Sequence, residues 1–377
     1  MILPPPDVRA IDGADNREAG YWWRQIGDPV LANLVERGLA RNQEIACEAL
    51  ALNKAVDRAA ARDKRLDIQI NRFFGSGNSG ADRAVLMAHA YRHAARRARL
   101  AAEIAEAYIE VRRLQEVLAL REAVQSQYSD NAEIASFRRE AGLVSGIDTG
   151  VAGSLQAVAA TGLETTRVRY RNALAALAKL VTARDTMIDQ MLGQRGQVPD
   201  IAGNALTAAE PNLVHRADLL SLSQQLSAQL IRKGQSPLAL DAEESSGVSA
   251  KQGDAFADQA RASYRKAQDG AAAEQTRLRE VVAAAAEQED ELAQRAALAR
   301  RTVEDARLAY RGGTGDFATL FVAEAAALAL EEARVTARAD MANAMIRFWT
   351  SLGSGWENAD LMPQEPAQDT DEVLVCE

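Results

Sequence analysis

The sequence predicts a mainly α-helical protein made of long antiparallel coiled-coil hairpins in two internal repeats, with little or vestigial β-structure. Three observations predict this class. Alanine and other strong helix formers dominate a chain in which aromatic residues make up 5% and prolines number nine. Apolar residues recur at a 4-3 spacing over long stretches. Glycine-marked breaks recur at a fixed offset along the chain, as in repeat proteins.

Helices are expected between these breaks. The first should cover 30–64, because Asp28 and Pro29 suit a helix N-terminus. A very long helix should follow over 83–141 and end at Gly142, and the next should run from after that turn to 192. The remaining helices are predicted at 211–233, 254–311 and 316–352.

An internal repeat is the strongest pattern. Gly142 and Gly313 each end a long helix and lie 171 residues apart. The same offset aligns two apolar seams with coiled-coil spacing. The first comprises Ile104, Ala107, Val111, Leu114 and Leu118, and the second Leu278, Val282, Ala285, Leu292, Ala296, Ala299, Val303, Ala306 and Tyr310.

The domain organisation follows from the repeat. Residues 1–20 are expected to be disordered, 21–192 to form the first repeat and 211–352 the second. The first repeat would have a short connection at 65–82 and a tip at 142–148, and the second a connection at 233–253 and a tip at 312–316. A linker at 193–210 and an acidic disordered tail at 353–377 complete the chain.

Charge and composition exclude several classes of protein. The net charge of −9 disfavours a nucleic-acid-binding surface. Cys47 and Cys376 suggest neither a disulfide framework nor a zinc site. No apolar run approaches the roughly 20 residues of a membrane-spanning helix. The first residues lack the features of a secretion signal, so the chain as written would stay in the cytoplasm unless its true N-terminus lies upstream.

Three other features are given their simpler interpretation. Residues 75–80 spell G-S-G-N-S-G, a glycine pattern found in phosphate-binding loops, but no βαβ unit surrounds it, so a connecting turn is favoured. His89 and His93 have a spacing that can hold a metal, but no third ligand is near, so a solvated helix face is favoured. The arginines in 92–99 are interpreted as a solvated coiled-coil flank. No catalytic motif is found, so we expect no enzyme, cofactor or metal.

The chain resembles the TolC-type outer-membrane efflux protein family, in particular its OprM/NodT-like outer-membrane lipoprotein branch. The N-terminal match is YWWRQIGDPVLANLVERGLARNQEI, and the mid-chain match ends in REAGLVSGIDTGVAGSLQA. The fullest match runs from ARLAYRGGTGDFATLFVAEAAALALEEARV to the closing L-G-x-G-W of the family. The segment LVHRADLL has Ala217 where the family usually has proline. Together the matches cover nearly all of 21–356.

This resemblance implies a homotrimer that forms a periplasmic helical tunnel and acts as a passive conduit for efflux or type I secretion. It also implies a periplasmic adaptor protein, an inner-membrane pump and a location in the outer membrane and periplasm. The adaptor would dock on the two hairpin tips. The docking residues implied are Gly142, Leu143, Val144, Ser145, Gly313, Thr314, Gly315 and Asp316.

The sequence departs from the family in three places. Neither short connection shows the two alternating strands that each half of the family's membrane barrel needs, so the barrel is expected to be missing or vestigial. No lipid-anchor cysteine precedes Trp22. Thr319 and Val322 stand where the family often has acidic gate residues, which leaves Asp148 and Asp316 as the acidic gate candidates. The alternative is a barrel-less relic that serves as a soluble helical interaction protein.

Overall fold

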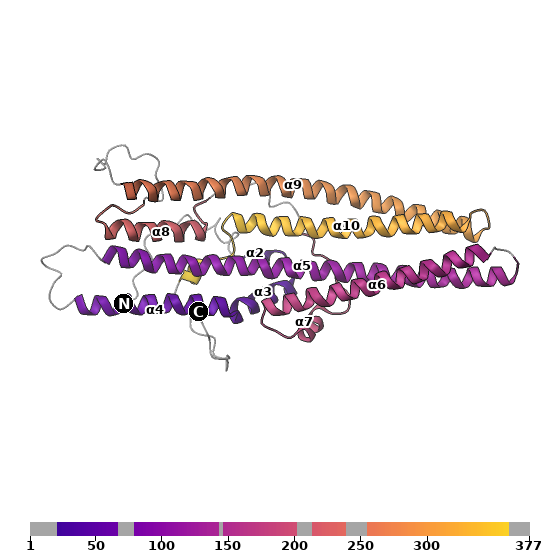
Figure 1. Ribbon diagram of the computed structural model, residues 1–377, viewed down its shortest axis with the longest axis horizontal. Helices are drawn as coiled ribbons and strands as arrows, with labels where there is room; N and C mark the ends of the chain where they lie inside the picture. Colours follow the sequence, from indigo (N-terminus) through magenta and orange to yellow (C-terminus); the bar gives the residue numbers. More distant parts are fainter. Residues whose placement is uncertain (1–20, 67–78, 143–145, 202–212, 239–254, 362–377) are drawn as a thin grey trace. The chain divides into compact units, whose positions relative to one another are not determined.

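The computed structural model describes residues 21–66, 79–142, 146–201, 213–238 and 255–361. Every regular element among these residues is helical, as Figure 1 shows, which confirms the mainly α-helical class with little β-structure. Most of the two predicted short connections lies outside the described residues, as does the segment 1–20. Of the G-S-G-N-S-G loop only Ser79 and Gly80 are described, and they begin a helix.

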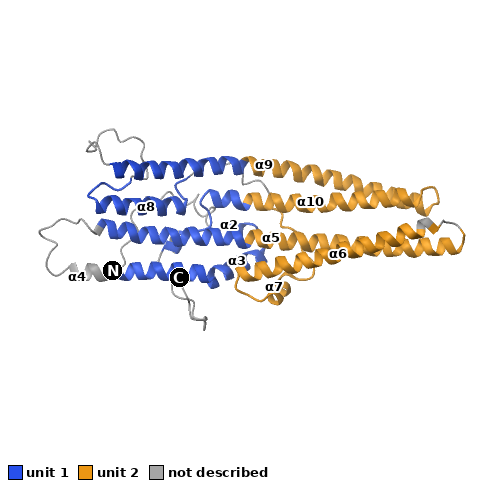
Figure 2. Ribbon diagram, viewed as in Figure 1, with its two compact units in different colours: residues 1–104, 204–279, 346–377 blue, residues 105–203, 280–345 orange. Residues whose placement is uncertain are grey.

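The chain forms two compact units, coloured separately in Figure 2. Unit 1 comprises Met1–Ile104, Asn204–Arg279 and Ile346–Glu377, and unit 2 comprises Ala105–Gly203 and Glu280–Met345. Each unit therefore contains segments from both predicted repeats. In the described part of the chain, no helix is both long enough and apolar enough to cross a membrane.

Unit 1 contains most of the shorter helices. Its elements are α2 (Trp22–Gln25), α3 (Pro29–Arg41), α4 (Gln43–Leu66), the first part of α5 (Ser79–Glu140), α8 (Ala217–Arg232), the first part of α9 (Ala255–Arg311), the end of α10 (Phe317–Ser351) and the 3-10 helix η2 (Asn358–Leu361).

The prediction of one helix over 30–64 is wrong, because Asn42 divides it into α3 and α4. Asn42 has an extended backbone conformation, and its side-chain oxygen accepts hydrogen bonds from the backbone N–H groups of Glu44 (3.0 Å) and Ile45 (3.4 Å). Asparagine is a strong N-cap residue, so it ends one helix and starts the next. Asp28 caps α3 in the same manner, as predicted, with Pro29 in the first turn.

The aromatic residues at the N-terminal end are the centre of the unit 1 core. Trp22 and Trp23 are almost fully buried, and Trp22 packs against Trp349 with their ring centroids 5.7 Å apart. Gly355 lies over Trp22, where an added Cβ would come within 3.4 Å of its Nε1. The N-terminal match and the end of the C-terminal match therefore meet in one core.

The closing L-G-x-G-W segment also wraps around the start of α8. Trp356 donates a hydrogen bond from Nε1 to the carbonyl of His215 (3.1 Å). At Gly353, where φ is +87°, an added Cβ would lie 2.5 Å from the same carbonyl oxygen. Only glycine satisfies both the positive φ and this close approach.

His93 is not on a solvated helix face, as the sequence suggested, but is completely buried. Its Nδ1 donates to the backbone carbonyl of Asp360 in η2 (3.1 Å). The Asp360 carboxylate is paired with Arg97 (2.9 Å) and accepts a hydrogen bond from the Tyr21 hydroxyl (3.3 Å). Residues 353–361, predicted as the beginning of a disordered tail, are thus tied to α5.

Of the arginines in 92–99, Arg92 and Arg99 are exposed, as expected of a solvated flank, whereas Arg96 and Arg97 form ion pairs within unit 1. Besides the Arg97 pair, Arg96 forms ion pairs with Glu103 (3.1 Å) and with Glu44 of α4. The two cysteines suggested no disulfide framework, but Cys47 in α4 is disulfide-bonded. The other cysteine of the sequence, Cys376, lies outside the described residues.

Unit 2 contains the ends of both long hairpins. Its elements are the second part of α5, α6 (Gly146–Leu180), α7 (Asp185–Leu192), the second part of α9 and the first part of α10. The prediction of one helix up to 192 is wrong, because the chain breaks after Leu180, where Thr182 has a positive φ of 50°.

The segment that follows α7 is held against α5 by polar side chains. Arg112 donates to the carbonyl of Leu192 (3.0 Å), and Gln115 donates to that of Gly193 (2.9 Å). The Glu116 carboxylate accepts the backbone N–H of Val198 (3.3 Å). Gly196 lies so close that an added Cβ would be 2.1 Å from Arg112 Nη1. These contacts satisfy buried polar groups that would otherwise be left unpaired.

The two predicted coiled-coil seams are confirmed as the inward faces of α5 and α9. Every seam residue is buried or half-buried, and Ile104, Val111 and Val282 are fully buried. The polar residue between Ala285 and Leu292 in the second seam, Glu289, is also half-buried.

Candidate docking and gate site

The predicted docking and gate residues all belong to unit 2, where both hairpins reverse direction. At the first tip, Gly142 follows α5 with a φ of +73°, and its N–H donates to the carbonyl of Arg139 (2.9 Å). Leu143, Val144 and Ser145 lie outside the described residues, and so does the side chain of Asp148 in α6. Gly142 supplies the left-handed backbone conformation that often ends a helix.

The second tip is described completely and is a Schellman turn. Gly313, also with a φ of +73°, donates to the carbonyl of Tyr310 (3.2 Å). The next residue, Thr314, donates to the carbonyl of Ala309 (2.9 Å). An added Cβ on Gly315 would lie 3.0 Å from the Ala309 side chain. The turn is thus specified by glycine geometry as well as hydrogen bonding.

Asp316 and Thr319, two of the gate candidates, form the N-terminal cap of α10. One carboxylate oxygen of Asp316 accepts the backbone N–H of Thr319 (2.7 Å), and the other accepts its hydroxyl (3.1 Å). The hydrogen bond from the backbone N–H lowers the pKa of the Asp316 carboxyl below its usual value. Asp316 is exposed and negatively charged, but its oxygens already stabilise the first turn of the helix.

Val322 belongs to a group of large apolar side chains that unit 2 leaves exposed near the tips. Its exposed fraction is 64%, compared with 61% for Phe137 of α5 and 69% for Leu308 of α9. Exposed apolar residues that gather near one region are typical of interaction surfaces.

Aromatic and cationic side chains join the two hairpins beside the tips. The guanidinium of Arg138, near the end of α5, lies 4.6 Å from the ring centroid of Tyr310 in α9. Tyr310 in turn packs against Phe317, at the start of α10, with a centroid distance of 5.9 Å. The cation–π contact and the ring contact place the ends of both hairpins side by side.

A buried ion pair lies one to two helical turns farther from the tips. Glu324 of α10 is paired with Arg307 of α9 (3.0 Å) and accepts a hydrogen bond from Asn131 of α5 (3.3 Å). Its side chain is only 3% exposed. The sequence analysis did not identify Glu324. An isolated acid in the alanine-rich run at 323–329 is the signal that could have revealed it.

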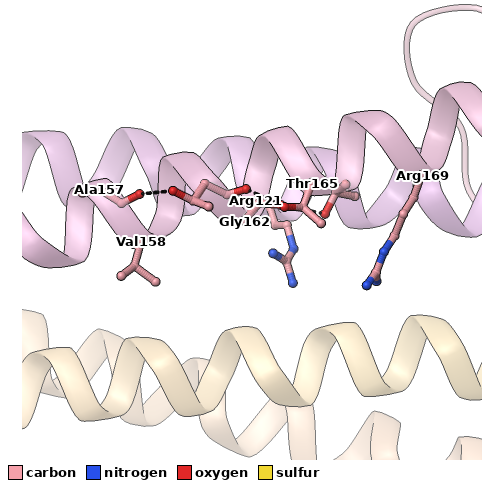
Figure 3. Close-up of a pocket in the computed structure, with 8 residues that line it drawn as sticks. Arg121, Ala157, Val158, Gly162, Thr165 and Arg169 are labelled. Carbon is pink, nitrogen blue, oxygen red and sulfur yellow. Dashed lines mark hydrogen bonds between the residues drawn. The ribbon is translucent and has the colours of Figure 1, made fainter.

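A shallow hollow of about 480 Å³ lies along α6, shown in Figure 3. It is lined by Arg121 of α5 and by Ala157, Val158, Thr161, Gly162, Thr165, Thr166 and Arg169 of α6. Val158 and Arg169 point to the same side of α6. An added Cβ at Gly162 would lie 2.5 Å from Nη1 of Arg121, so a larger residue there would make the Arg121 side chain move. The threonine hydroxyls donate to carbonyls of their own helix, so they add little polar character to the hollow.

Within the described ranges, no group of three potential ligands is arranged to hold a metal ion. The residues near the tips contain no paired nucleophile and base, and their chemistry is that of helix capping and apolar contact. Such a site can bind another protein or line a passage.

Solved structures of outer-membrane channels share this fold. The outer-membrane channel OprN superposes with a TM-score of 0.72 at 20% identity, covering 94% of this chain and 99% of that one. VceC from Vibrio cholerae has a TM-score of 0.70 at 18% identity, covering 89% of this chain and 99% of that one. The CmeC channel from Campylobacter jejuni has a TM-score of 0.71 at 15% identity, with coverages of 90% and 88%.

No protein-family model and no curated protein sequence matches the chain. The chain nevertheless has the TolC-type fold of outer-membrane efflux channels, which confirms the structural side of the resemblance. OprN and CmeC are outer-membrane channels, and VceC is an outer membrane protein.

Proposed function

We propose that this chain is the trimeric, passive conduit of a tripartite efflux or type I secretion-like system, located at the outer membrane and periplasm, and that its hairpin tips dock a periplasmic adaptor. The observation that carries the proposal is an exposed coiled-coil seam on each edge helix of unit 2. The order of the helices and the composition of the two seams support it.

The four long helices of unit 2 are arranged in the order α6, α5, α10, α9, as Figure 2 shows for the orange unit, and the short helix α7 packs against α6. Gln156 of α6 donates to Ser129 of α5 (3.0 Å). Arg121 of α5 pairs with Glu332 of α10 (2.6 Å). The Arg307–Glu324 pair joins α9 to α10. Helices α6 and α9 are therefore the edges of this arrangement, and each has a face without a neighbour in the unit.

The open face of α6 has the 4-3 spacing of a coiled coil and contains no charge. All of its seam positions are exposed: Val151, Ser154, Val158, Thr161, Thr165, Val168, Asn172 and Ala175. A solvated helix face normally carries charged residues, so an uncharged seam of this length favours burial against another helix.

The open face of α9 has the same spacing but includes charges. Its exposed seam positions are Val281, Ala284, Gln288, Glu291, Arg295, Leu298, Thr302 and Asp305. If α6 of one copy packs against α9 of the next, the contact is head-to-tail, and a rotation that closes gives a ring. Three copies with four helices each would form the twelve-helix tunnel implied by the resemblance.

A row of exposed, uncharged residues along α10 supports a conduit with little selectivity for what it transports. Ala318, Thr319, Val322, Ala326 and Ala329 are exposed and uncharged. In the proposed ring this stripe lines the passage, with Val322 in place of an acidic gate residue. Asp316 remains at the entrance as an acidic group that also caps α10.

The mass of the purified chain in solution tests assembly. Light scattering after size exclusion, with detergent and without, should give about three times the 40.6 kDa of one chain. The double variant Val158→Glu, Val168→Glu places two charges in the α6 seam and should give the mass of one chain. Ala119→Glu, at an exposed position of α5, is the matched control and should remain trimeric. A single-chain mass for the unaltered protein would refute the conduit.

Docking is tested separately at the described tip. Thr314→Cys carrying a photo-crosslinker should capture an adaptor protein in cells, while the same probe at Arg277 in unit 1 should not. Recovery of the chain only in the soluble fraction, with no adaptor captured, would instead favour the helical interaction protein named above.

A further inference from the structure

Contacts between neighbouring helices of unit 2 show which of their residues lie at the same height along the unit. Arg121 of α5 pairs with Glu332 of α10 (2.6 Å). The residue after Arg121, Glu122, pairs with Arg167 of α6 (3.3 Å). Because α5 and α6 are the two antiparallel arms of one hairpin, one step back along α5 is one step forward along α6. Val168 of α6 therefore lies at the height of Arg121.

The same reasoning reaches α9 from the other side of the unit. Arg300 of α9 pairs with Glu331 of α10, one residue before the glutamate that binds α5 (3.0 Å). These helices are also the antiparallel arms of one hairpin, so Ala299 lies at the height of that glutamate, next to Leu298. The heights of Val168 on one edge helix and Leu298 on the other thus agree to within about one residue, or roughly 1.5 Å.

Val168 and Leu298 are large apolar side chains that one copy leaves open on opposite edges of unit 2. Their exposed fractions are 43% and 66%. The proposed ring, on which this inference rests, relates its copies by rotation alone, so no copy is shifted along the axis. Residues at the same height on the two edges then face each other, and Val168 of one copy meets Leu298 of the next.

Opposite charges lie on the tip side of this apolar contact. Helix α6 runs away from the tips and α9 runs toward them, so the tip side lies before Val168 and after Leu298. Glu164 is four residues before Val168, and Arg301 is three residues after Leu298. Both are exposed; Glu164 pairs with arginines of its own helix, and Arg301 forms no ion pair among the described residues. Glu164 and Arg301 are called the tip-side pair.

A second set of opposite charges lies on the other side of the contact. Lys179 and Glu287 each lie eleven residues from it on their own helix, or roughly 16 Å. Both are exposed, and neither forms an ion pair within the described part of the chain. They are called the far pair. Between the far pair and the contact, Arg295 is already paired with Glu291 of its own helix, so these two charges cancel.

We propose that Val168 packs against Leu298 of the next copy, with the tip-side pair and the far pair forming ion pairs between the two copies on either side. Exposed ion pairs add little affinity, but like charges brought together at a contact are costly. The two pairs therefore select the partner, because a helix of another protein without this order of charges is disfavoured. The partner that fits is a second copy of this chain at the same height.

Photo-crosslinking tests the alignment. A benzoylphenylalanine in place of Val168 should link one chain to the next under ultraviolet light, and digestion with trypsin should locate the link in the peptide 296–300, which contains Leu298. Moving the probe two turns toward the tips, to Thr161, should move the link to the peptide 302–307. Links to other peptides of α9, or a shift in the opposite direction, would overturn the alignment.

Charge reversal tests the two pairs. The variant Glu164→Arg, Lys179→Glu and the variant Arg301→Glu, Glu287→Lys each place like charges in both pairs. Each should raise the dissociation constant of the trimer by at least about tenfold. The chain with all four substitutions has opposite charges again, so its dissociation constant should return to within about threefold of wild type.

Sedimentation of the full-length chain in detergent, over a range of concentrations, measures these dissociation constants. Equal values for wild type and both double variants, or no recovery with all four substitutions, would refute the ion pairs.

The failure of this contact can be distinguished from the failure of the trimer. A wild-type chain that sediments as a single copy would refute the proposed conduit, and this contact with it. A wild-type trimer whose cross-links fall elsewhere, or whose assembly withstands charge reversal, would refute the contact alone and leave the conduit standing.

Discussion

At the scale of single residues, close neighbours rather than local propensity determine what a position can hold. In the closing L-G-x-G-W segment, a side chain at Gly353 would overlap the backbone of His215, and one at Gly355 would press against Ala98. Burial lowers the pKa of His93, although the hydrogen bond from its Nδ1 to the carbonyl of Asp360 acts in the opposite sense. Two predictions belong to this scale.

Gly353→Ala should destabilise the protein by about 2 kcal/mol or more, because it combines a positive φ with a steric overlap at the His215 carbonyl. Urea unfolding measures the change. Gly270→Ala is the matched control, since Gly270 lies within α9 with no atom near its Cβ position. It should stabilise the helix by up to about 1 kcal/mol. Equal effects of the two substitutions would contradict the role given to Gly353.

The stability of unit 1 should fall as the pH drops below about 6.5. Burial lowers the pKa of His93 in the folded chain, and the charge of nearby Arg97 lowers it further. The hydrogen bond to the backbone carbonyl of Asp360 and the charges of Asp360 and Glu48 raise this pKa, but their effect is smaller. The unfolded chain therefore binds the proton more tightly. The contribution of neutral His93 to the free energy of unfolding is fully present above pH 6.5. It is lost as the pH falls toward the lower pKa of His93 in the folded chain.

Unfolding free energies of wild type and His93→Gln between pH 8 and 5.5 check this dependence. The variant should be less stable at pH 8 and should lose less stability on acidification. His215→Gln is a useful comparison, because burial lowers the pKa of half-buried His215 as well. Parallel curves for wild type and His93→Gln would show that His93 does not titrate on unfolding.

At the scale of elements, side chains that end or join helices set the architecture. Asn42 and the break after Leu180 divide helices that apolar periodicity alone predicted as continuous. Apolar periodicity indicates which face of a helix is buried. A helix end, in contrast, can be set by one residue whose side chain hydrogen-bonds to nearby backbone groups. Between hairpins, buried polar contacts such as that of Glu324 hold α5, α9 and α10 together.

Glu324→Ala should destabilise unit 2 by roughly 2–3 kcal/mol, because it leaves Arg307 and Asn131 without their shared acceptor. Partial exposure of Arg307 keeps the effect below that of a fully buried pair. Glu122→Ala breaks an exposed pair with Arg167 and should change stability by no more than about 0.5 kcal/mol. Thermal unfolding of both variants provides the comparison, and a larger loss for Glu122→Ala would contradict it.

At the scale of the whole molecule, the exposed seams of α6 and α9 connect the fold to the proposed assembly. A protein that is stabilised by association melts at a higher temperature when it is more concentrated. The melting temperature of wild type should therefore rise over a hundredfold increase in concentration, whereas that of Val158→Glu, Val168→Glu should not. A concentration-independent melting temperature for wild type would contradict assembly through these seams.

The sequence by itself determined the helical class, the inward faces of α5 and α9, and the glycines Gly142 and Gly313 that follow the ends of these two helices. Apolar periodicity and glycine at helix ends depend on residues close together in the sequence, so both can be recognised from one amino-acid sequence. Only the tertiary structure decided that Glu324 is buried between hairpins and that His93 and Arg97 hold η2. These roles depend on groups far apart in sequence, and the partner of a polar side chain is set by packing rather than by its own neighbourhood.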